Sequence, residues 1–168
     1  MRTAGILLAV FVALALQTTL ARYIRGSAAV DLVLVVVVYV ALTSGPVAGL
    51  LTGTLGGLVQ DAMATGVIGI GGLAKTLVGF LAGVIGTQFI VAQPLPRFLV
   101  FFGATLLHSL VFVGLYLLLD LRHFGTPYTT AVGQAAGNAA VGVVAFQLVE
   151  LLPGAVERRR AAKSRLRR

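Results

Sequence analysis

Six long apolar segments fill most of this chain, and they constrain its fold more than any other feature. They cover approximately residues 4–20, 30–43, 45–60, 67–90, 98–119 and 129–152. A helix that crosses the hydrocarbon core of a bilayer needs roughly 20 apolar residues. Of the 168 residues, 58% are hydrophobic and only 11% are charged, far less charge than the surface of a water-soluble domain requires. The sequence therefore predicts an all-α integral membrane protein, a bundle of about six transmembrane helices joined by short loops.

The segments also fix the domain organisation. They are too continuous for the alternating strands of a membrane β-barrel, so residues 1–152 are expected to form one six-helix transmembrane domain. Pro153-Gly154 is expected to end the last helix, which leaves residues 153–168 as a basic tail. Met1-Arg2 and the run Ala13-Leu14-Ala15 would also suit a cleaved signal peptide, but the five later segments need no such leader.

Lysine and arginine indicate the orientation, because they are enriched in cytoplasmic loops. With six spans and a cytoplasmic N-terminus, nine of these side chains lie inside and three lie outside, and the tail supplies most of the difference. Both termini are therefore expected on the cytoplasmic side of the inner membrane. This orientation places Asp31, Asp61 and Asp120 near the outer surface.

Glycines recur at four-residue spacing in three of the segments, which puts them on single helix faces. These positions are Gly45, Gly49, Gly53 and Gly57 in the third segment, Gly79 and Gly83 in the fourth, and Gly133 and Gly137 in the sixth. Helices associate in lipid through close packing and hydrogen bonds, and small residues allow that close approach. The faces either pack against each other inside the bundle or receive the transmembrane helix of a partner protein.

Lys75 lies about nine residues into the fourth segment, roughly 13 Å deep at 1.5 Å per residue. A lysine at this depth is costly unless it pairs or reaches the headgroups. Gln60 and Asp61 are its first expected partners, and Asp31 is the next. The four residues form either a structural ion-pair cluster or the lining of an outward-facing polar cavity. His108, in the fifth segment, is expected to be a neutral packing residue.

The sequence offers no catalytic set. GIGGLAKT, residues 69–76, lacks the glycine directly before the lysine that a phosphate-binding loop requires. Three separated aspartates and two distant histidines form neither a metal site nor a nucleophile–base pair, and cysteine is absent. The chain is expected to be no enzyme and to have no cofactor or metal.

The basic tail is expected to contact anionic lipids, since each lysine or arginine near an anionic leaflet contributes about 1 kcal/mol. Its positive residues are Arg158, Arg159, Arg160, Lys163, Arg165, Arg167 and Arg168. An acidic cytoplasmic partner is the alternative, and nucleic acid is not expected.

Residues 31–83 resemble the centre of the bacterial rod-shape-determining family MreD. The elements that carry the resemblance are Asp31 opening an apolar helix, Tyr39, the glycine-spaced segment 45–57, the run Gly57-Leu58-Val59-Gln60-Asp61, and Gly66 with Gly69. Length, number of spans and short loops agree over the whole chain. The resemblance implies a noncatalytic membrane scaffold of the cell-elongation machinery, which synthesises peptidoglycan and maintains rod shape.

The resemblance also implies partners. MreC, a single-span protein with a large outer domain, would bind directly, with Gly49, Gly53 and Gly57 as the preferred groove. MreB, the RodA glycosyltransferase and a penicillin-binding transpeptidase would be linked through MreC. The family is similar in fold to the S components of energy-coupling factor transporters, so the alternative function is binding of a vitamin or other small molecule from the outer side for uptake. A channel or secondary transporter is less favoured, because few charges lie within the segments.

Overall fold

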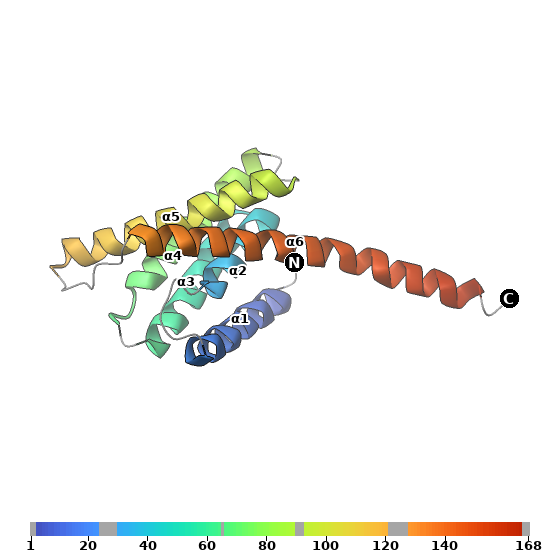
Figure 1. Cartoon of the computed structure of the whole chain (residues 1–168), viewed down its shortest axis with the longest axis horizontal. Helices are drawn as coiled ribbons and strands as arrows, with labels where there is room; N and C mark the ends of the chain where they lie inside the picture. Colours follow the sequence, from blue (N-terminus) through green and yellow to red (C-terminus); the bar gives the residue numbers. More distant parts are fainter. Residues whose placement is uncertain (1–2, 24–29, 65, 90–92, 121–127, 166–168) are drawn as a thin grey trace.

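The chain folds into a bundle of six helices, shown in the computed structural model of Figure 1. The structure describes the backbone of residues 3–23, 30–64, 66–89, 93–120 and 128–165, and side chains within residues 3–19, 30–64, 66–89, 93–120 and 129–151. The helices are α1 (Thr3–Tyr23), α2 (Leu32–Ser44), α3 (Pro46–Met63), α4 (Ile70–Gln88), α5 (Pro94–Leu118) and α6 (Tyr128–Arg165). These ranges contain no strand, so the all-α prediction is confirmed.

The short helix α2 is the centre of the bundle. Its sequence, LVLVVVVYVALTS, is apolar on every side, as expected for a helix surrounded by others. It contacts all five of the other helices, and seven of its 13 residues are buried. Thirteen residues span only about 20 Å, less than the hydrocarbon thickness of roughly 30 Å. We infer that at least one end of α2 lies at a depth where protein, and not water, must satisfy its backbone.

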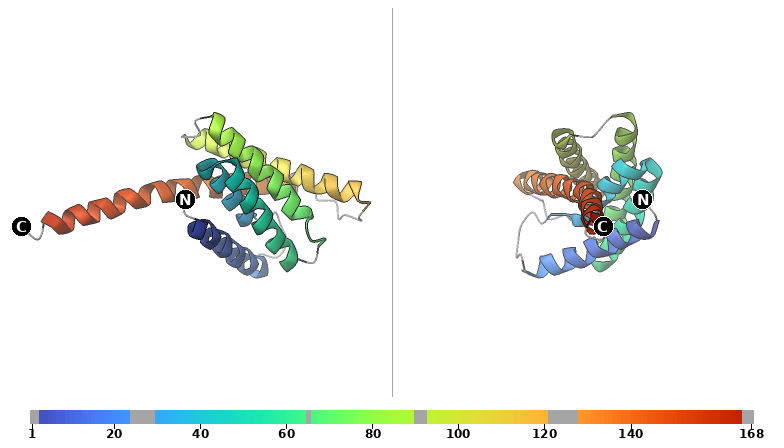
Figure 2. Two further views of the ribbon diagram at one scale, coloured as in Figure 1. Left: turned by 180° about the vertical axis from the view of Figure 1, so that it is seen from behind. Right: turned by 90° about the vertical axis from the view of Figure 1, so that its right-hand side faces the viewer.

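The glycine faces of α3 and α4 pack against each other. A Cβ atom added at Gly49 would overlap the carbonyl oxygen of Gly79, and one at Gly53 would overlap that of Lys75. At Gly57 the added atom would meet the backbone of Gly72. The two backbones are therefore in direct contact, with α3 and α4 side by side in both views of Figure 2.

This packing decides between the two interpretations of the glycine spacing for α3. Gly49, Gly53 and Gly57 were the preferred groove for the MreC helix, but α4 of the same chain already fills that groove. The expectation is corrected here: these glycines serve packing within the chain. Gly83 also packs internally, against the backbone of Pro46, whereas Gly45 has open space and a φ of +91°, so its glycine suits the backbone conformation at the α2–α3 turn.

The last helix is longer than the sequence predicts. Pro153-Gly154 was expected to end it, but α6 continues to Arg165 and its C-terminal part projects beyond the bundle (Figures 1 and 2). A proline removes only one backbone donor, and the Ala, Glu, Arg and Lys residues that follow are good helix formers. The apolar part of its sequence does end close to the predicted position, because Glu157 and the basic residues follow soon after Pro153-Gly154.

The outside of the bundle is apolar. Leu8, Phe11, Leu110 and Leu148 are each more than half exposed, a surface that suits lipid and not water. Within the described residues, α4, α5 and the α6 segment Thr129–Leu151 are long and apolar enough to cross a membrane, and α1 and α2 contain shorter apolar helices. The chain is a membrane protein.

The α3–α4 contact gives the first prediction. Gly53→Ala places a methyl group against the backbone of α4, and overpacking of this kind costs about 1–3 kcal/mol of folding stability. Gly103→Ala on α5 is the matched control, because no atom lies within 4 Å of its added Cβ. We expect a lower unfolding temperature in detergent for the first variant only; equal stability of both variants would contradict the described packing.

Candidate functional site

The first turn of α2 is the point where several helices exchange polar contacts. The backbone N–H of Asp31 donates to Asn138 Oδ1 of α6 at 2.8 Å, and that of Leu32 donates to Gln17 Oε1 of α1 at 2.8 Å. The N–H of Leu34 donates to the Asp31 carboxylate, Oδ1, at 3.0 Å. Three N–H groups at the start of α2 thus donate to side-chain acceptors, and two of these acceptors belong to other helices. We call this group of contacts the α2 junction.

Asn138 extends the junction to a fourth helix. Its amide nitrogen, Nδ2, donates to Thr105 Oγ1 of α5 at 3.1 Å, while its oxygen accepts from Asp31. Asn138 is fully buried, so loss of its side chain would leave the buried Asp31 N–H on α2 without its acceptor and would break the link to Thr105 on α5. A lone asparagine in an apolar helix indicates an interhelical hydrogen bond, but the sequence does not show which helix it reaches, and Gln17 carries no signal at all.

Asp31 also binds the deep lysine. Lys75 Nζ lies 2.9 Å from Asp31 Oδ2, and both side chains are almost fully buried. His108 Nε2 on α5 lies 3.3 Å from the same ammonium nitrogen. Because an ammonium group only donates hydrogen bonds, Nε2 accepts, and the ring proton is assigned to Nδ1. Removing either partner of a buried charge pair strongly lowers folding stability, because the other charge is then left buried without its counter-charge.

The observed partners differ from the predicted order. The sequence placed Gln60 and Asp61 first and Asp31 next, because Asp61 lies close in the chain to α4. The structure instead uses Asp61 as a cap for α4: its Oδ2 accepts from the N–H groups of Gly69 and Gly72, both at 2.9 Å. The unpaired N–H groups and the positive end of the dipole at the start of a helix attract a carboxylate. Asp61 therefore binds at the start of α4 and not to Lys75 in the next turn.

All four predicted cluster residues nevertheless border one cavity of about 290 Å³, together with His108, Ser109, Phe112 and Gln134. Gln60 contributes an unusual atom, since its Oε1 is buried and has no hydrogen-bond partner among the described residues. The chain therefore has a polar cavity at the end of the bundle where α2 and α4 begin. In the part of the chain that the structure describes, no three His, Asp or Glu side chains come together as a metal site.

A second buried charge lies at the opposite end of the bundle. Arg97 is 5% exposed in the first turn of α5, where the sequence had placed it in a loop. Its guanidinium donates to both carboxylate oxygens of Glu150 on α6 and lies over the Phe146 ring, 4.4 Å from the ring centre. This contact joins α5 to α6, and nothing in the sequence indicates it beyond the charges themselves.

The remaining predicted positions have different surroundings. Gly133 is exposed on α6, and a Cβ at Gly137 would touch Val30. The side chains of Arg158, Arg159, Arg160, Lys163 and Arg165, and the whole of Arg167 and Arg168, lie outside the described residues. The acidic or lipid partner of the tail therefore stays a prediction.

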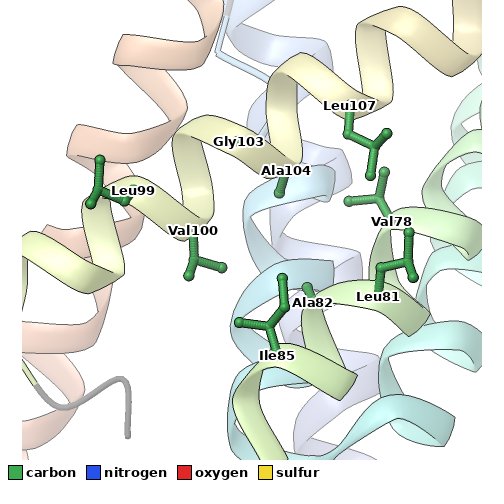
Figure 3. Close-up of a pocket in the computed structure, with 9 residues that line it drawn as sticks. All are labelled: Val78, Leu81, Ala82, Ile85, Leu99, Val100, Gly103, Ala104 and Leu107. Carbon is green, nitrogen blue, oxygen red and sulfur yellow. The ribbon is translucent and has the colours of Figure 1, made fainter. Parts of the chain in front are cut away.

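An apolar groove of about 310 Å³ runs between α4 and α5. Figure 3 shows side chains of both helices facing each other across it, with Val78, Ala82 and Ile85 on one side and Val100, Ala104 and Leu107 on the other. Leu99, also in the lining, is 60% exposed, so the groove opens on the outside of the bundle. Gly103 leaves space at its edge, because nothing lies within 4 Å of an added Cβ.

A family model described as rod shape-determining protein MreD matches residues 2–152, which is nearly the whole bundle. The chain belongs to the MreD family. Membership assigns it a role in rod-shape determination and confirms the resemblance noted in residues 31–83. No curated protein and no solved structure matches the chain, so its likeness to the S components of transporters stays a prediction.

The ion pair generates the second prediction. Lys75→Met leaves the Asp31 carboxylate buried without its opposite charge and should lower folding stability by about 3–5 kcal/mol. Adding Asp31→Asn removes that uncompensated charge and keeps an acceptor for Leu34, so the double variant should recover much of the loss. Unfolding of the purified variants in detergent measures this, and a double variant no more stable than Lys75→Met would contradict the pairing.

The α2 junction generates the third prediction. Asn138→Leu leaves the buried Asp31 N–H without its acceptor, at about 1–3 kcal/mol for a group left unpaired in a buried position. It also removes one of the two hydrogen bonds of the Thr105 hydroxyl, which still donates to the Phe101 carbonyl. Gln147→Leu is a matched control on the same helix, because Gln147 is exposed. We expect a clear drop in unfolding temperature for Asn138→Leu alone, and similar values for both variants would refute the role of the junction.

Proposed function

We propose that this MreD-family chain is a noncatalytic scaffold of the cell-elongation machinery and that it binds MreC directly. The family match over residues 2–152 carries this proposal. The internal bonds support it further, because Asp31, Lys75 and Arg97 are all committed to contacts between helices. Charges used in this way favour a rigid structural subunit. MreB, RodA and a penicillin-binding transpeptidase would be reached through MreC.

On this proposal the protein lies in the bacterial inner membrane with six crossings and both termini in the cytoplasm. The nine-to-three distribution of lysine and arginine supports the orientation. The projecting part of α6 would then enter the cytoplasm, where its basic residues meet the anionic leaflet. The α2 junction and the polar cavity would lie toward the outer surface.

We assign the α4–α5 groove, in place of the filled glycine face of α3, as the surface that receives the MreC transmembrane helix. The groove is apolar, opens on the outside of the bundle and has Gly103 and Ala104 in its wall. Small residues let a second helix approach closely, and close packing is what drives association within lipid. A single-span partner offers one such helix.

The fourth prediction tests both parts of the proposal. The tagged protein, solubilised gently from its own membranes, should co-purify with MreC and, through it, with wall-synthesis enzymes. Gly103→Leu places a side chain at the edge of the groove, starting from a Cβ position with no atom within 4 Å, and should reduce the recovered MreC several-fold. Gly114→Leu is the matched control, since it also lies on α5 with open space around its Cβ.

The outcomes separate the hypotheses. Loss of MreC with Gly103→Leu but not with Gly114→Leu supports the groove. Equal recovery of MreC with both variants would reject the groove as the binding surface but would leave the scaffold proposal in place. Recovery of a coupling membrane subunit with paired ATPases, in place of MreC, would overturn the scaffold proposal in favour of small-molecule uptake.

A further inference from the structure

The polar cavity has features that rigid packing does not explain. It is entered at the end of the bundle where α2 and α4 begin and α3 ends. Asp31, Lys75 and His108 are buried in its wall, whereas Ala64, also in the wall, is exposed. The cavity of about 290 Å³ has room for about ten water molecules at roughly 30 Å³ each. It is therefore large enough for a small polar ligand.

The charges in the wall do not cancel. Lys75 and Asp31 form a pair at 2.9 Å, and His108 accepts from the same ammonium with its ring neutral. Asp61 is the remaining ionisable group of the lining, and it has no cation as partner among the described residues. The lining thus has a net charge of −1, carried by the least buried of its charged side chains.

Two oxygen acceptors near this charge are unused. Asp61 employs Oδ2 for both of its bonds to the start of α4, and Oδ1 accepts from no donor in the described parts of the chain. Gln60, the preceding residue, has an unpaired Oε1, and the broad terminal torsion of glutamine lets that oxygen turn toward a ligand. Unsatisfied buried polar groups are rare in folded proteins. Because Gln60 lines the cavity, its unpaired Oε1 points to a hydrogen-bond donor supplied by a ligand.

The lining also contains an aromatic ring. Phe112 lines the cavity one turn of α5 beyond His108, and its ring lies 5.9 Å from the imidazole, centre to centre. The face of a phenyl ring attracts cations. A carboxylate, an amide oxygen and an aromatic face together match a group that is positively charged and donates several hydrogen bonds. An anion would instead meet the uncompensated charge of Asp61.

We propose that this cavity binds a small primary ammonium group, held by Asp61, Gln60 and Phe112. The group has two sources with the same chemistry: a free amine such as ethanolamine, or the headgroup of phosphatidylethanolamine in the adjoining leaflet. A quaternary ammonium, as in phosphatidylcholine, has the charge but no N–H donors, so it should bind more weakly. This site is independent of MreC binding, and its test uses the purified protein alone.

The test measures binding in lipid nanodiscs made from phosphatidylcholine and phosphatidylglycerol. Ethanolamine should raise the unfolding temperature of the full-length protein, whereas ethylene glycol, its neutral analogue, should not. Native mass spectrometry of protein released from nanodiscs that also contain phosphatidylethanolamine then reports retained lipid. Binding of free ethanolamine identifies a free amine as sufficient; retention of phosphatidylethanolamine without binding of ethanolamine identifies the lipid headgroup. Either result supports the site.

Three variants make the result specific. Asp61→Asn keeps an acceptor for α4 but removes the charge, and it should weaken binding by about tenfold or more, as expected for loss of a charge-assisted contact. Gln60→Leu removes an unpaired group, so it should fold normally and still weaken binding. Asp120→Asn, at the same end of the bundle and outside the cavity lining, is the control.

Three results would overturn the proposal. The first is that neither ethanolamine nor phosphatidylethanolamine binds, which would leave a water-filled cavity. The second is that ethylene glycol stabilises the protein as well as ethanolamine does. The third is that Asp61→Asn and Gln60→Leu bind as the unaltered protein does.

Discussion

The first turn of α2 is the constraint on which the rest of this bundle depends. A helix of 13 residues cannot reach both surfaces of a bilayer, and within lipid no water is available for unpaired backbone donors. Asp31, Asn138 and Gln17 supply the acceptors, so the start of α2 fixes the positions of α1 and α6. The carboxylate of Asp31 then needs an opposite charge, and Lys75 brings α4 to the same point. One short helix thereby determines where three others lie.

Backbone contact completes the arrangement. The glycines of α3 bring its backbone against that of α4, which holds Lys75 at the correct height to meet Asp31. At the other end, Arg97 and Glu150 join α5 to α6. Internal bonds therefore take up the buried charges and the main glycine face, whereas the α4–α5 groove and the polar cavity stay open among the described residues.

Much of this fold is predictable from the sequence, because apolar length and glycine spacing are local signals. The six helices and the deep position of Lys75 follow from them. The pairings do not, since they depend on how the helices are arranged around α2: nothing in the sequence indicates that Asp31 is nearer than Asp61 to Lys75, or that Asn138 meets Asp31 across 107 positions. The continuation of α6 beyond Pro153 was missed because a proline was treated as a stop, and the filled groove on α3 because spacing alone does not identify the occupant.

The most direct test of this account is amide hydrogen exchange at the start of α2 in nanodiscs, compared between the unaltered protein and Asn138→Leu. The first amides of an ordinary helix exchange quickly, because they lack intrahelical partners. We expect Asp31, Leu32 and Leu34 to exchange as slowly as Val37 in the middle of the helix, and Asn138→Leu to accelerate the exchange of Asp31 first. Fast exchange of these three amides in the unaltered protein would contradict it, because the α2 junction would then not hold the bundle together.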